Sequence, residues 1–110
     1  MSVRVITSLQ RFTRTIEASK LQPAKAVIFD FWAPWCRPCK AISPVFEKLA
    51  ESNKSVEFCS VNTDDFQDIA TQAEIRALPT FLAFKNGEKV GEVIGANSQE
   101  LEALVKKLSG

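Results

Sequence analysis

The chain has 110 residues, of which 45% are hydrophobic and 25% are charged, and its 14 basic and 13 acidic residues leave a net charge of +1. This length and composition predict a single domain over residues 1–110 with an ordinary core, and the near-neutral charge excludes the basic footprint of a nucleic-acid-binding protein. The absence of His excludes hydrolases with an imidazole base, and three Cys cannot close a four-ligand zinc site, so no metal is expected.

No stretch approaches the roughly 20 apolar residues that span a bilayer, so no membrane association is expected. The first residues lack the apolar run of a secretory signal. Arg4, Arg11 and Arg14 are weakly similar to the basic residues of an organellar transit peptide, but Glu17 follows them and the segment has a folded pattern. We therefore expect a cytoplasmic protein in a reducing compartment. In such a compartment, two closely spaced Cys are more typical of a catalytic or metal-binding site than of a structural role.

The first predicted elements are a short strand and a helix. The apolar run Val3–Ile6 predicts the strand, and Thr7 with Gln10 predicts a capping box that starts the helix. Apolar residues then recur at helical spacing until the segment 21–25, which contains a proline and ends the helix.

A second strand and helix carry the residues of chemical interest. Residues 26–32 are apolar at both parities apart from Asp30, as is typical of a strand covered on both faces of a sheet. The helix that follows begins at the two closely spaced Cys, and we expect Pro44 to bend it near Lys40. One face of this helix is predicted to be buried, and it consists of Cys39, Ile42, Phe46 and Leu49.

The second half predicts three strands and two helices. Asn86-Gly87 is the strongest signal, because this dipeptide is typical of a two-residue hairpin turn. In chain order the elements are a strand at 56–61, a short helix at 66–73, strands at 80–84 and 89–94, and a helix that begins with the capping pair Asn97 and Glu100. The order β-α-β-α-β-α-β-β-α predicts an α/β mixed sheet with helices on both faces.

Cys36 and Cys39 are separated by two residues at a predicted helix start, which suits dithiol–disulfide exchange. Unpaired amide donors and the helix dipole stabilise a thiolate there. We expect Cys36 to lie at an exposed tip and attack an external disulfide, after which the buried Cys39 attacks the mixed disulfide and releases the reduced substrate. Two alternatives are a pair of packing cysteines, which the polar and proline neighbours disfavour, and half of a zinc site completed by a second chain.

Asp30 is the only carboxylate in the predicted 26–32 strand. Its neighbours on both faces of the strand are apolar, so we expect a desolvated carboxyl with its pKa raised towards neutrality. Such a group is suited to accept or supply a proton during exchange at Cys39, through water. The alternative is an edge strand in which Asp30 faces solvent.

The segment from Asp30 to Lys40, with Leu78-Pro79-Thr80 further along, resembles the thioredoxin family. The resemblance continues through Phe84-Lys-Asn-Gly87 and Gly95-Ala96-Asn97, and it is strongest to small eukaryotic cytosolic members. It implies a thioredoxin fold with a central five-stranded mixed sheet flanked by four helices. It also implies an enzyme, a general protein-disulfide reductase that binds no cofactor and receives electrons from NADPH through thioredoxin reductase.

Roles and partners follow from the same resemblance. It makes Cys36 the nucleophile, Cys39 the resolving thiol and Asp30 the buried acid, and it implies a redox-active disulfide between the two Cys. The implied partners are thioredoxin reductase and disulfide-containing targets of the peroxiredoxin, methionine sulfoxide reductase or ribonucleotide reductase type. The implied protein is a monomer.

The resemblance also makes Pro79 a cis-proline that faces the dithiol and, with Arg37 and Pro38, tunes its redox chemistry. A cis bond there would leave the Leu78 backbone free to pair with an extended substrate segment. The implied apolar docking surface consists of Trp35, Ala77, Leu78, Pro79, Gly95 and Ala96.

Two positions depart from the family pattern. Arg37 stands where most thioredoxins carry Gly. Its guanidinium should favour the Cys36 thiolate and make the protein more oxidising by about 10–40 mV, unless solvent screening cancels the effect. Ser60 stands where many thioredoxins carry a Lys near the buried acid, so the pKa of Asp30 is expected to be higher without that cation.

Two further residues are interpreted from their surroundings. Asp64 matches an Asp that often accepts the indole hydrogen of the active-site Trp, so a hydrogen bond from Trp35 is expected, with a helix cap as the alternative. Cys59 lies in an apolar strand and is expected to be an inert packing residue, with a regulatory thiol as the alternative.

Three functions are compatible with the sequence. The first is the protein-disulfide reductase, and the second is an oxidase or isomerase of the same fold, which Arg37 would favour. The third is a binding module that is indifferent to its thiols. A Cys36→Ser variant separates the third function from the others, because only a redox protein loses its activity with the thiol.

Overall fold

The computed structural model describes residues 2–22 and 25–110, so part of the segment predicted to end the first helix lies outside the described residues. Over the described ranges, strands and helices follow each other in the predicted order. The elements are β1 (Val3–Val5), α1 (Leu9–Leu21), β2 (Ala26–Trp32), α2 (Arg37–Ser52), β3 (Val56–Asn62), α3 (Gln67–Gln72), β4 (Thr80–Lys85), β5 (Glu88–Ile94) and α4 (Ser98–Ser109).

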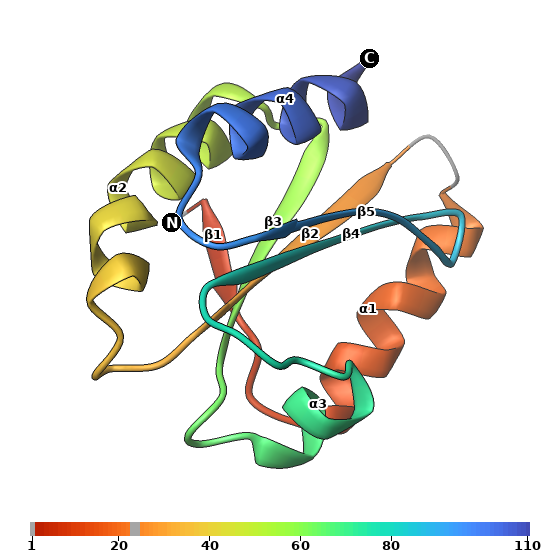
Figure 1. Ribbon diagram of the computed structural model, residues 1–110. Coiled ribbons are helices and arrows are strands. Elements are labelled where there is room, and N and C mark those ends of the chain that lie inside the picture. Colours follow the sequence, from red (N-terminus) through yellow and green to blue (C-terminus); the bar gives the residue numbers. More distant parts are fainter. Residues whose placement is uncertain (1, 23–24) are drawn as a thin grey trace.

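The five strands form one mixed sheet in the order β1-β3-β2-β4-β5 (Figure 1). β1, β3 and β2 run parallel, whereas β4 is antiparallel to β2 and β5 is antiparallel to β4. The predicted hairpin between β4 and β5 is confirmed, with φ of 55° at Asn86 and 78° at Gly87, as a turn of the primed type requires. Because β2 lies in the centre of the sheet, the edge-strand alternative for Asp30 is wrong.

Helices cover both faces of this sheet. α2 and α4 pack on one face and α1 and α3 on the other (Figure 1). Along β2 the side chains alternate between the two cores, so Ile28 joins the core under α2 and α4 while Phe29 joins the opposite core. The Phe46 ring of α2 lies 5.2 Å from that of Phe58 and 5.5 Å from that of Phe81, measured between centroids. These aromatic contacts hold α2 over the face of β2 that carries Asp30.

The N-cap predicted for α1 is wrong by one residue. Ser8, and not Thr7, caps the helix, and its Oγ accepts the backbone N–H of Arg11 at 3.0 Å. β1 ends at Val5, one residue earlier than predicted, although the N–H of Ile6 still donates to the carbonyl of Ser60 at 2.9 Å. At α4 the predicted pair is confirmed, since Oδ1 of Asn97 accepts the N–H of Glu100 at 3.0 Å.

The buried face of α2 also differs in its last member. Ala50 is buried and Leu49 is only partly buried, because Ile42, Phe46 and Ala50 follow each other at intervals of four residues on the face that meets the sheet. α2 continues through Pro44, and the predicted bend stays a prediction. Over the described ranges, no helix combines the length and the apolar character needed to traverse a bilayer.

Candidate active site

Cys36 and Cys39 lie beyond the carboxyl end of β2, where the chain enters α2 (Figure 1). A disulfide joins them, with their Cα atoms 5.3 Å apart. Cys36 is the N-cap of α2, and its Sγ accepts the backbone N–H of Cys39 at 3.2 Å. After reduction, this sulfur lies beside the unpaired amide donors and the positive end of the helix dipole, both of which favour a thiolate.

The prediction that Cys36 lies at an exposed tip is wrong. Its side chain is 4% exposed and that of Cys39 is 3% exposed, because the bonded sulfurs pack against Ala33, with Trp32 and Leu78 beside them. The residues around the motif, and not the sulfurs, face solvent, and they are Pro34, Trp35, Arg37 and Pro38. The surroundings of the two Cys differ in one respect, because Cys39, unlike Cys36, also lines a cavity that contains Asp30.

Asp30 is buried in the central strand, as predicted. Its side chain is 6% exposed, and its Oδ1 has no hydrogen-bond partner among the residues that the structure describes. Burial raises the pKa of Asp30 from 3.8 to about 7. Ser60 lies opposite Asp30 in the β2–β3 register, at the position where a cation would have lowered this pKa. The carboxyl therefore titrates near neutral pH, in the range that a proton-transfer group requires.

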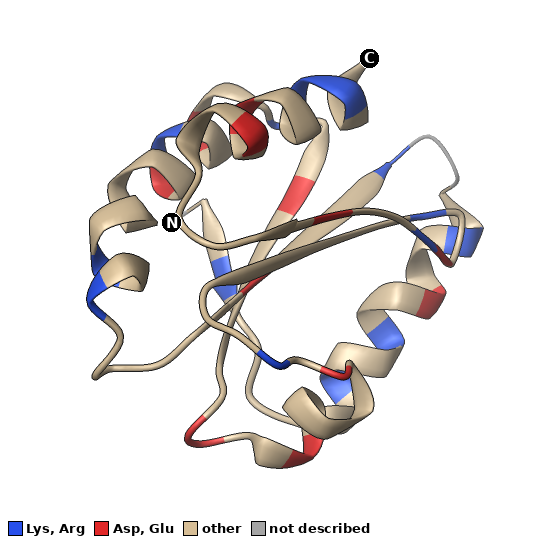
Figure 2. Cartoon of the chain, viewed as in Figure 1, with Lys and Arg blue, Asp and Glu red and all other residues tan. Residues whose placement is uncertain are grey.

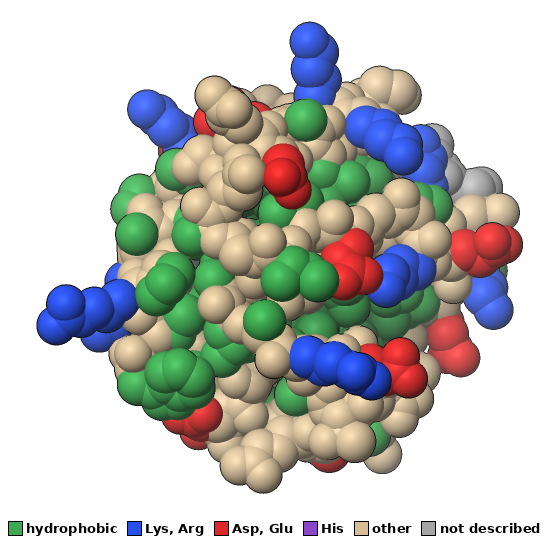
Figure 3. All heavy atoms as spheres, in the orientation of Figure 1, with side chains coloured by type: hydrophobic (Ala, Val, Ile, Leu, Met, Phe, Trp, Pro, Cys, Tyr) green, Lys and Arg blue, Asp and Glu red, His purple; other side chains and the backbone are tan. Residues whose placement is uncertain are grey.

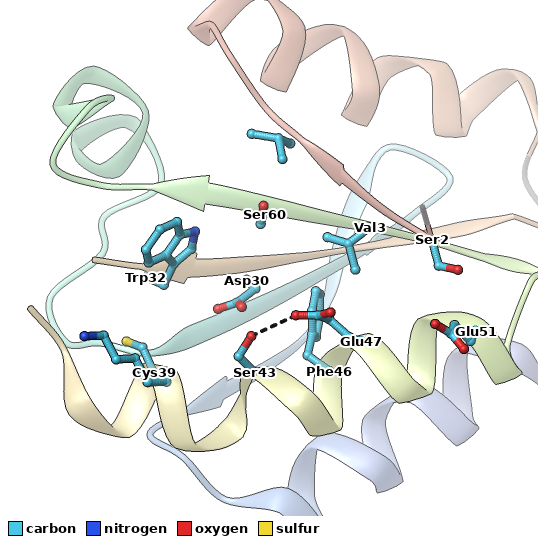
Figure 4. A pocket seen from close by; sticks show the side chains of 12 residues that line it. Ser2, Val3, Asp30, Trp32, Cys39, Ser43, Phe46, Glu47, Glu51 and Ser60 are labelled. Carbon is cyan, nitrogen blue, oxygen red and sulfur yellow. Dashed lines mark hydrogen bonds between the residues drawn. The ribbon is translucent and has the colours of Figure 1, made fainter. Parts of the chain in front are cut away.

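Figure 4 shows Asp30 and Cys39 facing a common cavity between β2 and α2. The cavity has a volume of about 340 Å³. Three of its polar residues were not predicted, namely Ser43, Glu47 and Glu51 of α2. Ser43 Oγ donates to Glu47 Oε2 at 3.1 Å. The available signal was their spacing of four residues, which places all three on one side of a helix next to its buried face.

Trp35 projects from the loop before α2 and is 68% exposed. Its Nε1 donates to Oδ1 of Asp64 at 3.2 Å, so the predicted hydrogen bond is confirmed. Asp64 does not cap α3, whose N-cap is Phe66 without a side-chain hydrogen bond. The hydrogen bond gives the exposed indole a fixed partner beside the dithiol.

The loop before β4 places a second apolar segment at the same end of the molecule. The Leu78–Pro79 peptide bond is cis, and the carbonyl of Pro79 accepts the N–H of Gly95 at 2.8 Å. Leu78 also packs against the cluster that contains both sulfurs. Ala77 and Ala96 are exposed, and Figure 3 shows hydrophobic side chains at the surface on the lower left, at the end where α2 begins in Figure 1.

Charges of opposite sign flank this end (Figure 2). Arg37 and Lys40 lie in the first turn of α2, and both are exposed. Asp64 and Asp65 lie in the connection between β3 and α3. In the described ranges, no three His, Cys, Asp or Glu side chains are grouped so that they could hold a metal ion.

Cys59 lies away from this site in the core under α1 and α3, and its side chain is 0% exposed. Burial, with a smaller contribution from Glu57, raises the pKa of the Cys59 thiol to about 12. The thiol is therefore protonated at neutral pH, as the interpretation of a packing residue requires.

Comparison with known proteins identifies relatives over nearly the whole chain. The family model described as Thioredoxin matches residues 3–108. A thioredoxin of Coprinus comatus is 43% identical over 107 residues, which cover 96% of each protein. The solved thioredoxin of Malassezia sympodialis is 41% identical, with a TM-score of 0.89 over 98% of this chain and 91% of that one.

A chain from a study of thiol resolution in yeast mitochondrial 1-Cys peroxiredoxin via glutathione/thioredoxin systems is also similar. It is 34% identical, with a TM-score of 0.87 over 96% of this chain and 95% of that one. The solved structures confirm the predicted five-stranded fold with four helices.

Proposed function

The chain belongs to the thioredoxin family, and from that premise we propose how its residues divide the work of protein-disulfide reduction. It is a protein-disulfide oxidoreductase that acts by dithiol–disulfide exchange. The observation that carries this function is the Cys36–Cys39 disulfide at the start of α2, with one sulfur as the N-cap.

The exchange takes place in two steps. The Cys36 thiolate attacks one sulfur of the target disulfide, so a bond forms between Cys36 and the target while the second target sulfur leaves as a thiolate. The Cys39 thiolate then attacks the Cys36 sulfur, which closes the intramolecular disulfide and expels the first target sulfur. The target gains two electrons and the protein loses two. Because the electrons pass only between sulfurs, no bound cofactor takes part.

Asp30 accepts the Cys39 proton in the second step. Two observations support this role. Asp30 lies in the cavity that Cys39 lines, and its pKa is about 7, so the carboxyl is ionised in roughly half of the molecules at neutral pH. Water in that cavity would carry the proton between the two groups. Cys36 needs no such base, because the helix N-terminus already favours its thiolate.

Targets dock on the apolar surface formed by Trp35, Ala77, Leu78, Gly95 and Ala96, whereas Pro79, which was predicted to belong to this surface, is buried. Leu78 supports this assignment, because its backbone makes no hydrogen bond to another of the described residues and is available to an extended target segment. Pairing at Leu78 would bring a target disulfide close to Cys36, since Leu78 packs against the sulfur cluster.

Reducing equivalents come from NADPH through thioredoxin reductase, and the targets include proteins of the peroxiredoxin, methionine sulfoxide reductase or ribonucleotide reductase type. The peroxiredoxin class has support from the similar chain of the yeast peroxiredoxin study. A dithiol that must return to its reduced form suits a reducing compartment, so we place the protein in the cytoplasm. As the family resemblance implies, we propose that it is a monomer.

Reduction of insulin with dithiothreitol as electron donor tests this function. The wild type should accelerate the precipitation of insulin chains, and Cys36→Ser should reduce the rate to that of dithiothreitol alone, because it lacks the attacking sulfur. Cys59→Ser is the matched control and should behave as wild type. Equal precipitation rates for the wild type and Cys36→Ser would instead identify a binding module.

Arg37→Gly is expected to make the protein more reducing. The guanidinium adjacent to Cys36 stabilises the thiolate and hence the reduced form, so its removal should lower the redox potential by about 10–40 mV. Equilibration with glutathione buffers measures the potential, and the pH dependence of alkylation measures the thiolate fraction of Cys36. Arg37→Lys keeps the charge and should stay near wild type. If all three proteins have the same redox potential, solvent screens the charge of Arg37 and the hypothesis of an oxidase loses its support.

Trp35→Ala is expected to weaken docking of protein targets. An exposed aromatic side chain beside the attacking sulfur should contribute to target affinity, so its removal should raise KM for a protein disulfide about tenfold, which corresponds to roughly 1.4 kcal/mol. A small disulfide that does not reach the indole should be reduced at the wild-type rate. Trp35→Phe retains the apolar ring and should lose less. An equal loss for both substrates would move the role of Trp35 from docking to the chemistry.

A further inference from the structure

The cavity between β2 and α2 is larger than proton transfer requires. Its volume of about 340 Å³ lies within the range of roughly 300–1,000 Å³ in which small-molecule sites fall, whereas a single water needs only about 10–15 Å³ on a comparable measure. Much of its wall is apolar, with Val3 and Val5 of β1, Trp32 of β2 and Phe46 of α2. The cavity therefore has room for a small organic molecule with a hydrocarbon part.

Of the four charged residues that line the cavity, three are acidic. The Asp30 carboxyl points into it, and its Oδ1 has no partner among the described residues (Figure 4). α2 contributes Glu47 and Glu51, and Ser43 already donates its hydrogen to Glu47. The one basic residue of the lining is Lys40. Burial raises the pKa of Asp30, and no cation contributes an opposing shift.

We propose that this cavity binds a small organic monocation, an alkylammonium or amidinium ion, with its charged head on the Asp30 carboxylate and its carbon chain against Val3, Val5 and Phe46. The unpartnered oxygen supplies an acceptor, and a charge-assisted hydrogen bond to it would be of the strong kind. Three carboxylates disfavour an anion. A metal ion would require several grouped oxygen ligands, and no such group of three exists in the described part of the chain.

This inference goes beyond disulfide exchange, because the ligand is neither a target nor an electron donor. It makes binding depend on pH through Asp30. The charged groups that face Asp30 across the cavity are Lys40, Glu47 and Glu51, all from α2, whereas β1 and β3 contribute uncharged residues to the lining. A cation binds the ionised carboxyl, so affinity should be full above the pKa of about 7 and fall below it.

Titration of the oxidised protein with n-butylammonium, followed by NMR of ¹³C-labelled Asp carboxyl groups, tests the proposal. At about pH 8.5 the Asp30 signal should shift and saturate with a millimolar Kd, and at about pH 5.5 the affinity should be at least tenfold lower. n-Butanol, which has the same chain without the charge, should bind at least tenfold more weakly at the higher pH.

Three variants locate the ion. Asp30→Asn, which conserves the shape of the side chain, should abolish saturable binding, and Glu102→Gln, which removes the same charge from an exposed site on α4, should leave it unchanged. Ser60→Lys would place a tethered ammonium opposite Asp30 and should compete with the ligand. Affinity that is retained in Asp30→Asn, equal affinity for n-butanol, or no saturable shift in the millimolar range would each overturn the proposal. None of these measurements depends on turnover.

Discussion

Replacing Asp30 with Asn will stabilise the folded protein by about 4 kcal/mol above neutral pH and change its stability little in acid. Burial raises the pKa of this carboxyl from 3.8 to about 7, so the folded state resists its ionisation. Below about pH 3.8 the group is protonated in both states and contributes no penalty. The penalty grows as the pH rises and is complete above pH 7, where a shift of about three pH units corresponds to about 4 kcal/mol.

Urea unfolding of wild type and Asp30→Asn at about pH 4 and about pH 8.5 measures this difference. The two proteins should have similar free energies of unfolding in acid and diverge in alkali. Glu102→Gln, which changes an exposed carboxyl on α4, controls for net charge and should track the wild type at both pH values. A difference that does not depend on pH would show that Asp30 is not the buried titrating group.

The same substitution should slow the chemistry. Asn cannot take up a proton, so the attack by Cys39 loses its base, and we expect resolution of the mixed disulfide to fall by about a hundredfold at neutral pH. The wild-type resolution rate should rise through pH 7 as Asp30 ionises, and the variant should lack this rise. A stabilised but slow variant would show that this buried carboxyl destabilises the fold and serves the reaction.

Most of the fold followed from local patterns in the sequence. The run 26–32 is apolar at both parities apart from Asp30, and β2 is the central strand. Asn86-Gly87 forms the β4–β5 turn. The predicted N-cap of α1 was wrong by one residue, and Ser8 is the cap in a structure where the N–H of Ile6 still pairs with the carbonyl of Ser60 in β3. A tertiary contact of that kind has no local signature.

The site was predicted in composition and only partly in geometry. Spacing and resemblance identified Cys36, Cys39 and Asp30, but the neighbours of Cys36 suggested exposure, whereas packing against Ala33 buries it. The cavity beside Cys39 was not predicted. Its wall comes from β1, β2, β3 and α2, so its volume depends on how these elements pack, which the spacing of residues along one helix does not reveal.

Replacing Cys39 with Ser will turn the protein into a covalent trap for its targets. Cys36 still attacks, but only a thiol from solution can then resolve the mixed disulfide. That reaction is slow, because an intramolecular thiol such as Cys39 acts at an effective concentration many orders of magnitude above that of a thiol in solution. Release should slow by at least about a thousandfold. Mass spectrometry should detect one target chain bound to Cys36, and dithiothreitol should remove it. Ser has nearly the volume of Cys, so this buried position should still pack.

Two controls identify the sulfur responsible. Cys36→Ser should form no adduct, because Cys39 lacks the N-cap position that favours a thiolate. Cys59 cannot replace Cys39, since it lies in the opposite core with a pKa of about 12, so Cys39→Ser with Cys59→Ser should trap as well as Cys39→Ser alone. Undiminished turnover by Cys39→Ser would mean that targets are released without a resolving thiol, and the two-step exchange would be wrong.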